Sequence, residues 1–179
     1  MSGEGVAFVT AEMLQEAGHE IVEVTAFNGI KVQCVKRGSA LVPVGKVTIY
    51  PMGKVPMYPR EELQRLQRMK QTDRKNFDKD PANEERIKEI KRLQHNYERS
   101  QEMFAKLSNV GFADSIETVS TMMSHLLAVG EEITADAEGS KEVRSTMQGP
   151  DGGLKVLSMW RVLPNGVKYL STITFIPTQ

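Results

Sequence analysis

KEVRSTMQGPDGGLKVLSMWRVLPNGVKYLSTITFIP, residues 141–177, is the stretch that decides the fold. It contains three runs rich in β-branched and aromatic residues, separated by the turn signals GPDGG and PNG. Alternating runs joined by glycine-containing turns are typical of an antiparallel meander. We therefore predict an α+β fold in which a C-terminal three-stranded antiparallel meander packs on helices.

The turn at Asn165-Gly166 favours a two-residue connection. It places Leu163 opposite Lys168 and Met159 opposite Thr172. One face then carries Trp160 and most of the bulky apolar residues, and we expect it to pack on a helix. The GPDGG turn fits four or five loop residues, and a slip by one residue would exchange the two faces. Keeping Val143 and Met147 on the Trp160 face favours the four-residue loop.

Residues 1–59 predict a small β-rich region. Thr10 can cap a short helix over residues 11–17, and the runs at 20–27 and 31–38 form a hairpin through a type I′ turn at Asn28-Gly29. GKVTIYP, residues 45–51, predicts a third strand. Three prolines within residues 51–59 mark a boundary. We expect 1–59 to be a docking or delivery piece and 60–179 to be the candidate effector domain.

The central segment is charged and helical. Helices are predicted over residues 60–71 and from an N-cap at Asp80 to Gly111, and a third apolar helix from Asp114 to Gly130. Residues 60–106 hold 13 Lys or Arg and 10 Asp or Glu. This near-balance favours a solvated face with i,i+4 ion pairs. The alternative is a basic helix that binds RNA phosphates.

Composition excludes several classes of protein. The net charge is zero, so no strong overall field attracts nucleic acid. Cys34 is the only cysteine, and no internal disulfide can form. Zinc spacing, P-loop and dinucleotide motifs are absent, so we predict no metal and no cofactor. No apolar run is long enough to span a membrane, and no signal peptide is visible, which predicts a cytoplasmic location. The oligomeric state is not indicated.

The face of the meander opposite Trp160 is the candidate site. Arginine forks and hydroxyl donors on one rigid surface suit a phosphodiester. A metal-independent ribonuclease needs a base, an acid and cations near the phosphorus, and His125 could move the protons. Trp160 could stack on a base, although a tryptophan in such a strand more often belongs to the core. The polar residues of this face are also ordinary on an outward sheet face. The predicted catalytic residues are His125, Arg144 and Thr172, and the predicted substrate-binding residues are Thr146, Trp160, Arg161, Lys168 and Thr174.

Residues 103–177 resemble a known family. MFAKLSNVGF, an amphipathic helix, and then EVRSTMQGPDGG, KVLSMWRV, PNG and KYLSTITFIP are similar to ribonuclease-like or uncharacterised C-terminal domains of bacterial polymorphic and contact-dependent inhibition toxins. The matching features are Gly149 to Gly152, Trp160, Thr172 or Thr174, and Pro177. The resemblance implies an effector that cleaves RNA, tRNA among the candidates, and a cognate immunity protein that neutralises it. The chain departs from the family in having no second histidine near His125, and nothing before residue 60 matches.

A second hypothesis needs no catalysis. The chain could be a non-enzymatic protein-binding module, such as a phage or bacterial accessory protein or an immunity-type protein. The charged helix or an open sheet edge would then contact the partner.

Overall fold

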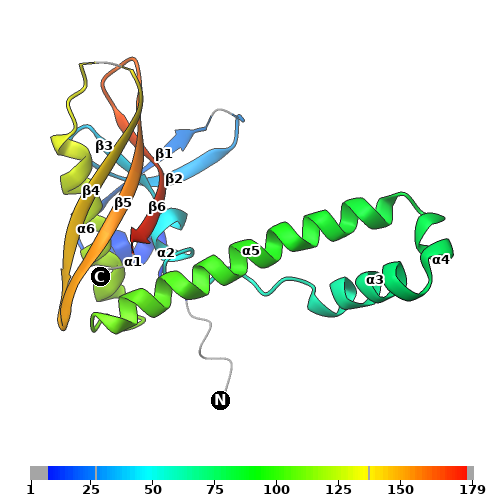
Figure 1. The fold of residues 1–179 in the computed structure, drawn as a ribbon. Coiled ribbons are helices and arrows are strands. Elements are labelled where there is room, and N and C mark those ends of the chain that lie inside the picture. Colours follow the sequence, from blue (N-terminus) through cyan, green and yellow to red (C-terminus); the bar gives the residue numbers. More distant parts are fainter. Residues whose placement is uncertain (1–7, 27, 137, 177–179) are drawn as a thin grey trace.

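The computed structural model describes residues 8–26, 28–136 and 138–176. A body built on one six-stranded sheet carries a long helical arm that extends to one side (Figure 1). The sheet confirms the α+β prediction, including the C-terminal meander on helices. In spatial order its strands are β1 Glu20–Thr25, β2 Lys31–Arg37, β3 Ala40–Pro43, β6 Lys168–Ile176, β5 Gly152–Val162 and β4 Gly139–Gly149.

The register of the meander is partly as predicted. Gln148 pairs with Gly153 and Val143 with Ser158, as the four-residue loop requires, and the ladder continues for one more pair. Met159 pairs with Thr172 as expected, but a β-bulge between Met159 and Trp160 shifts the rest by one residue. Beyond the bulge Trp160 pairs with Leu170 and Arg161 with Tyr169. The shift therefore exchanges the faces of the first residues of β6.

Helix α6, Ile116–Glu132, covers the Trp160 face and supplies much of the main core. Its N-cap is Ser115, whose hydroxyl accepts from the Thr118 N–H at 3.3 Å, so the predicted cap at Asp114 was wrong by one residue. The predicted end at Gly130 was also wrong. A Cβ on Gly130 would lie 2.6 Å from the Trp160 ring, so this glycine allows helix and sheet to approach closely.

The N-terminal region confirms the capped helix, α1 Ala11–Glu16, and the β1–β2 hairpin. The predicted two-residue type I′ turn was wrong, because Thr25 pairs with Lys31 and the Ala26 N–H donates to the Ile30 carbonyl at 2.8 Å, so the connection holds three residues. Phe27 in this turn lies outside the described residues, as does Pro177 of the family resemblance. The predicted strand over 45–51 was wrong, since Val44–Thr48 forms the short helix α2. Val44 and Val47 are buried at helical spacing, and this burial outweighs the β propensity of the segment.

Strand β3 joins the two halves of the chain. It pairs antiparallel with β2 and parallel with β6, where Leu41 lies opposite Tyr169. Strands from residues 1–59 and from residues 60–179 therefore belong to one sheet, and the expected boundary at residue 59 does not divide it.

The arm consists of α3 Arg60–Thr72, α4 Arg74–Asp78 and α5 Ala82–Asn109. Asp80 accepts from the Ala82 N–H at 3.0 Å and so supports the start of α5. Five buried side chains form a core separate from that of the body: Leu63, Leu66, Phe77, Ile87 and Ile90. Among the described residues, no helix has the length and apolar character needed to cross a membrane.

Ion pairs satisfy part of the charge on the arm. Arg86 pairs with Glu62 at 2.6 Å and Lys70 with Glu84 at 2.8 Å, which tie α3 to α5. At the base of the arm, the Ser100 hydroxyl donates to the carbonyl of Tyr50 at 2.7 Å. The far half of α5 is thus held by α3, and its near half is held by the body.

Candidate functional site

The candidate site is the face of the sheet that does not carry Trp160, which we call the open face. Strand pairing places Lys36, Leu41, Tyr169 and Arg161 in one row across β2, β3, β6 and β5. Helix α6 packs on the opposite face. The open face therefore spans strands from both ends of the chain.

Apolar side chains occupy much of the open face. Cys34 and Leu41 are buried, yet neither belongs to the main core under α6. Burial raises the pKa of the Cys34 thiol to about 11, and it also raises the pKa of Tyr169 beside it. Further apolar residues of this face are partly exposed, among them Val22, Val24, Val32, Leu157, Met159, Leu163 and Tyr169.

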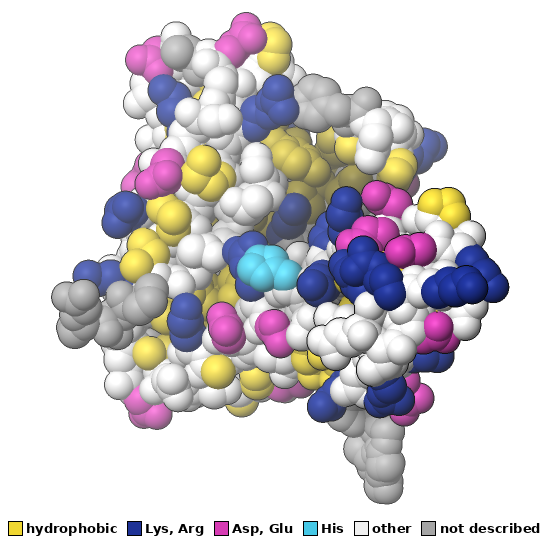
Figure 2. Space-filling view, turned by 45° about the vertical axis from the view of Figure 1, so that its right-hand side comes forward, with side chains coloured by type: hydrophobic (Ala, Val, Ile, Leu, Met, Phe, Trp, Pro, Cys, Tyr) yellow, Lys and Arg dark blue, Asp and Glu magenta, His cyan; other side chains and the backbone are white. Residues whose placement is uncertain are grey.

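The open face is hollowed. Val24 near the end of β1 and Leu163 just after β5 line one pocket of about 500 Å³, although β2, β3 and β6 lie between those strands. The sheet must therefore curl strongly. A second pocket, lined by Val22, Val24, Leu41 and Val167, adjoins the first at Val24. We call the two together the apolar groove. Figure 2 shows hydrophobic side chains at the floor of a hollow between body and arm, with Lys and Arg side chains around it.

Exposed cations lie on the same face. Lys36 lines the groove and Arg161 pairs with Tyr169 at its edge, whereas Lys155 and Arg144 lie farther away on β5 and β4. Lys36, Lys155 and Arg161 are exposed, and Arg144 is exposed beside Glu142 at 3.7 Å. The register also puts the carboxylate of Glu20 on this face, opposite Lys36. An exposed ion pair of this length contributes little, so Arg144 stays accessible to a ligand.

Arg99 was not predicted as a site residue. It belongs to α5, donates to the Thr174 hydroxyl at 3.1 Å and lies 5.8 Å from the ring centre of Tyr50. It therefore adds a guanidinium where the arm meets the sheet. Nothing in the local sequence indicates this contact, because Thr174 lies 75 positions away. The predicted pairing of Leu163 with Lys168 puts the next residue, Tyr169, on the Trp160 face, and only the bulge brings it to the open face.

Five of the predicted site residues do share the open face: Arg144, Thr146, Arg161, Thr172 and Thr174. They do not converge. Arg144 lies opposite Leu157, which is four residues along β5 from Arg161, or about 13 Å at the usual strand rise. Thr172 pairs with Met159, between these two levels. This spread suits an extended ligand better than a single phosphate.

Lys168 and Trp160 lie on the covered face. The bulge turns Lys168 inward, where it is 3% exposed and its ammonium donates to the Glu131 carbonyl at 3.3 Å. Trp160 is completely buried, and its indole N–H donates to the Ser158 hydroxyl at 2.9 Å. Neither side chain can contact a ligand on the open face, so both roles predicted for them are corrected.

His125 also lies on the other side of the sheet. It projects from α6 to the Ser145 hydroxyl on β4 at 2.8 Å, and burial lowers its pKa. The sheet separates His125 from Arg144 and Thr172, so the three predicted catalytic residues do not form one site. His19 likewise contacts α6, through the Ser120 hydroxyl at 2.8 Å, and burial followed by the charge of Arg37 lowers its pKa.

The arrangement provides contact area and positive charge. Within residues 8–26, 28–136 and 138–176, no group of His, Cys, Asp and Glu side chains is placed to hold a metal ion. The open face offers apolar pockets, guanidinium and ammonium donors, and hydroxyls, which together can bind an amphipathic anionic ligand. No protein-family model matches this sequence, and no curated protein sequence is significantly similar to it.

Proposed function

We propose that the protein is a non-enzymatic binding module whose open face holds an amphipathic, acidic segment of a protein partner. The observation that carries this proposal is the apolar groove with cations on the same face. Soluble proteins rarely expose contiguous apolar patches, and the patches that they do expose often mark interaction sites. The apolar groove would take the partner's hydrophobic side chains and the cations of the open face its carboxylates.

Charge complementarity selects the chemistry of the partner. Lys36, Arg99, Arg144, Lys155 and Arg161 lie on or beside this face, against the carboxylates of Glu20 and Glu142. A segment with apolar residues flanked by Asp or Glu would satisfy both parts of the surface. The ribonuclease hypothesis has weaker support, because its proton-transfer residue, His125, is on the far side of the sheet from Arg144 and Thr172.

Selection from a random peptide library displayed on phage tests the proposal. We expect enrichment of peptides that combine Leu, Ile or Phe with Asp or Glu. Val24→Asp, which places a charge in the groove, should abolish their binding, and Arg161→Gln should weaken it. Ile30→Asp is the matched control, since Ile30 is 60% exposed in the hairpin turn and lines neither pocket. Circular dichroism would verify the fold of each variant.

Two outcomes would overturn the proposal. One is a selection that yields no consensus peptide, or one whose peptides lose binding equally to Val24→Asp and to Ile30→Asp. The other comes from incubating the purified protein with total RNA in EDTA, where we expect the RNA to stay intact. Fragmentation that Arg144→Ala abolishes would support the ribonuclease hypothesis in its place.

A further inference from the structure

A second surface lies along α5, where cationic residues follow one side of the helix. Lys88, Arg92, His95 and Arg99 are spaced by four, three and four residues, which places them within a narrow sector of the helix. We call these four residues the cationic stripe. All are exposed. The apolar core of the arm uses a different side of α5, through Ile87 and Ile90.

Two contacts at the base of the arm fix the direction of the stripe. Arg99 donates to the Thr174 hydroxyl, and Lys106, seven residues later on the same side of α5, donates to the Phe175 carbonyl at 3.1 Å. This side of α5 therefore faces β6. Arg92 and His95 project from it farther out along the arm. Figure 2 shows a histidine flanked by Lys and Arg side chains where the arm adjoins the hollow of the body.

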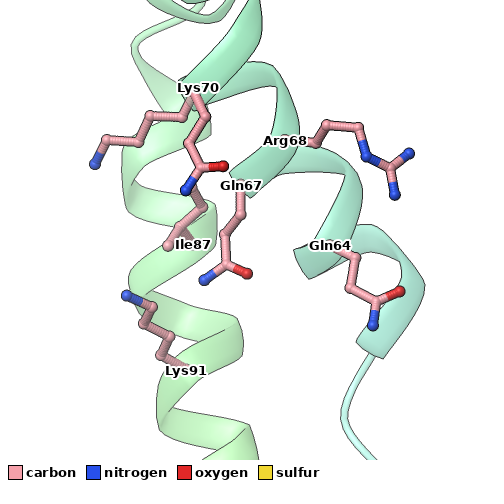
Figure 3. Close-up of a pocket in the computed structure, with 7 residues that line it drawn as sticks. Gln64, Gln67, Arg68, Lys70, Ile87 and Lys91 are labelled. Atoms are coloured by element: carbon pink, nitrogen blue, oxygen red, sulfur yellow. The ribbon is translucent and has the colours of Figure 1, made fainter.

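A groove between α3 and α5 lies beside the stripe, and Lys91, which precedes Arg92, is the α5 cation that lines it. Its lining side chains are Ile87, cations and amides, without a carboxylate, although the arm is rich in Asp and Glu elsewhere. Gln67 extends from α3 to a point below Ile87 between the two helices, Lys91 projects from α5, and Gln64 and Arg68 extend from the outer side of α3 (Figure 3). Amide N–H groups and ammonium groups are among the donors that bind phosphate oxygens.

Most acidic residues near this surface are engaged elsewhere. Glu62 and Glu84 pair with Arg86 and Lys70, and Glu98 accepts from Gln94 at 3.4 Å. In the described part of the chain, Lys88 is the one member of the stripe with a carboxylate partner, Glu85 at 3.5 Å, and both side chains are highly exposed. The net charge of zero therefore hides a local excess of cations from Lys91 to Arg99.

We propose that the cationic stripe binds the phosphodiester backbone of a nucleic acid strand. The strand would run from the groove at Gln67 and Lys91, past Arg92 and His95, to Arg99 and the hydroxyls of Thr174 and Thr172. The contacts are phosphate contacts, so they carry no base specificity. Their strength must fall with salt, because binding releases condensed counterions. This site meets the open face at Arg99, Thr174 and Thr172, but it includes none of the residues that line the apolar groove and does not require the proposed protein partner.

Fluorescence anisotropy of the full chain with labelled probes tests this inference. The probes are a short polyuridine RNA and a short DNA duplex, each titrated at several salt concentrations. We expect binding at low salt, and Lys91→Gln with Arg92→Gln should raise Kd by about tenfold or more. For the single strand, the slope of log K against log salt should fall by about 0.7 for each phosphate that the variant no longer neutralises. Preference for one probe identifies which nucleic acid is bound.

The matched control removes the same charge elsewhere on the arm. Lys75 and Lys79 are exposed at and just after α4, away from the stripe. Lys75→Gln with Lys79→Gln should leave Kd unchanged. Equal losses in the two double variants, or no binding of either probe at low salt, would overturn the proposal. Val24→Asp should leave RNA binding intact, which separates this test from that of the apolar groove.

Discussion

At Gly130 the sequence signal and the role of the residue differ. Glycine near the end of an apolar helix predicts a C-terminal stop, but α6 continues through Gly130 to Glu132. A Cβ there would lie 2.6 Å from the Trp160 ring and 2.8 Å from the Ala40 Cβ. Glycine is required at this position because α6 packs closely against β5 and β3. The local sequence around Gly130 does not indicate this contact.

We expect Gly130→Ala to lower the free energy of unfolding by about 1–3 kcal/mol, because the added methyl group overpacks the core. Urea unfolding followed by Trp160 fluorescence would measure it. Gly45→Ala in α2 is the control. Its Cβ would meet only Ile49 at 3.8 Å, so the change should be small or slightly stabilising. A neutral Gly130→Ala would show that helix and sheet are free to move apart.

Lys168 and His125 show why the candidate site was only partly predictable. Period-two alternation assigns Lys168 to the open face, but one bulge reverses this over the first residues of β6. His125 lies in an apolar helical stripe that could have met the sheet on either side. Arg144, Thr146, Arg161, Thr172 and Thr174 were assigned to the correct face, because their placement depends on the GPDGG turn and on the part of β6 from Thr172 onward, which keeps the predicted register.

At the scale of elements, two neighbouring residues at the start of α6, Asp114 and Ser115, have different roles. Ser115 has extended backbone angles and accepts from the Thr118 N–H. Asp114 instead accepts a hydrogen bond from the Lys54 ammonium at 2.6 Å. Asp114 and Glu117 have the spacing of a capping box, so the sequence alone favoured the wrong residue.

We expect Ser115→Ala to cost about 1 kcal/mol of stability, the usual effect of losing an N-cap side chain. Asp114→Asn, which keeps the side-chain shape and removes its charge, should cost less, because the ion pair with Lys54 is partly exposed. Thermal unfolding followed by circular dichroism gives both values. If Asp114→Asn proved the more damaging change, the cap assignment would be wrong.

Elements with a strong local pattern were predicted well. α1 has its Thr10 cap, α3 follows Pro59, and the meander has two clear turns. α2 was mistaken for a strand because its β-branched residues resemble one, whereas the burial of Val44 and Val47 selects a helix. Local pattern decides an element where tertiary contacts do not compete with it.

At the scale of the whole molecule, the arm has its own small core. Ile90 is completely buried within it, and the cluster shares no residue with the core under α6. We expect Ile90→Ala to open the arm locally, so that amide exchange in α3 quickens by at least about tenfold while β5 stays protected. Hydrogen exchange read by mass spectrometry would show this.

Leu127→Ala provides the contrast, since Leu127 is buried against the sheet. This variant should quicken exchange in β5 together with α6. Loss of protection in β5 on Ile90→Ala alone would mean that arm and body unfold as one unit.

The overall topology was beyond the reach of sequence patterns. The meander and the first hairpin are local, but the β3–β6 pairing joins Leu41 to Tyr169 across the whole arm. A short apolar run such as ALVP carries no sign of its distant partner. The single sheet, its curl and the apolar groove all follow from this pairing.

The β3–β6 pairing also affects how the chain folds during its synthesis. As the chain leaves the ribosome, β3 emerges beside β2 with its other edge bare, and the arm, α6 and two more strands must be made before β6 arrives. A naked strand edge invites pairing with foreign strands, and contacts between distant segments form slowly. The protein is therefore most exposed to misassembly after its N-terminal half has been synthesised and before β6 is available to pair with β3.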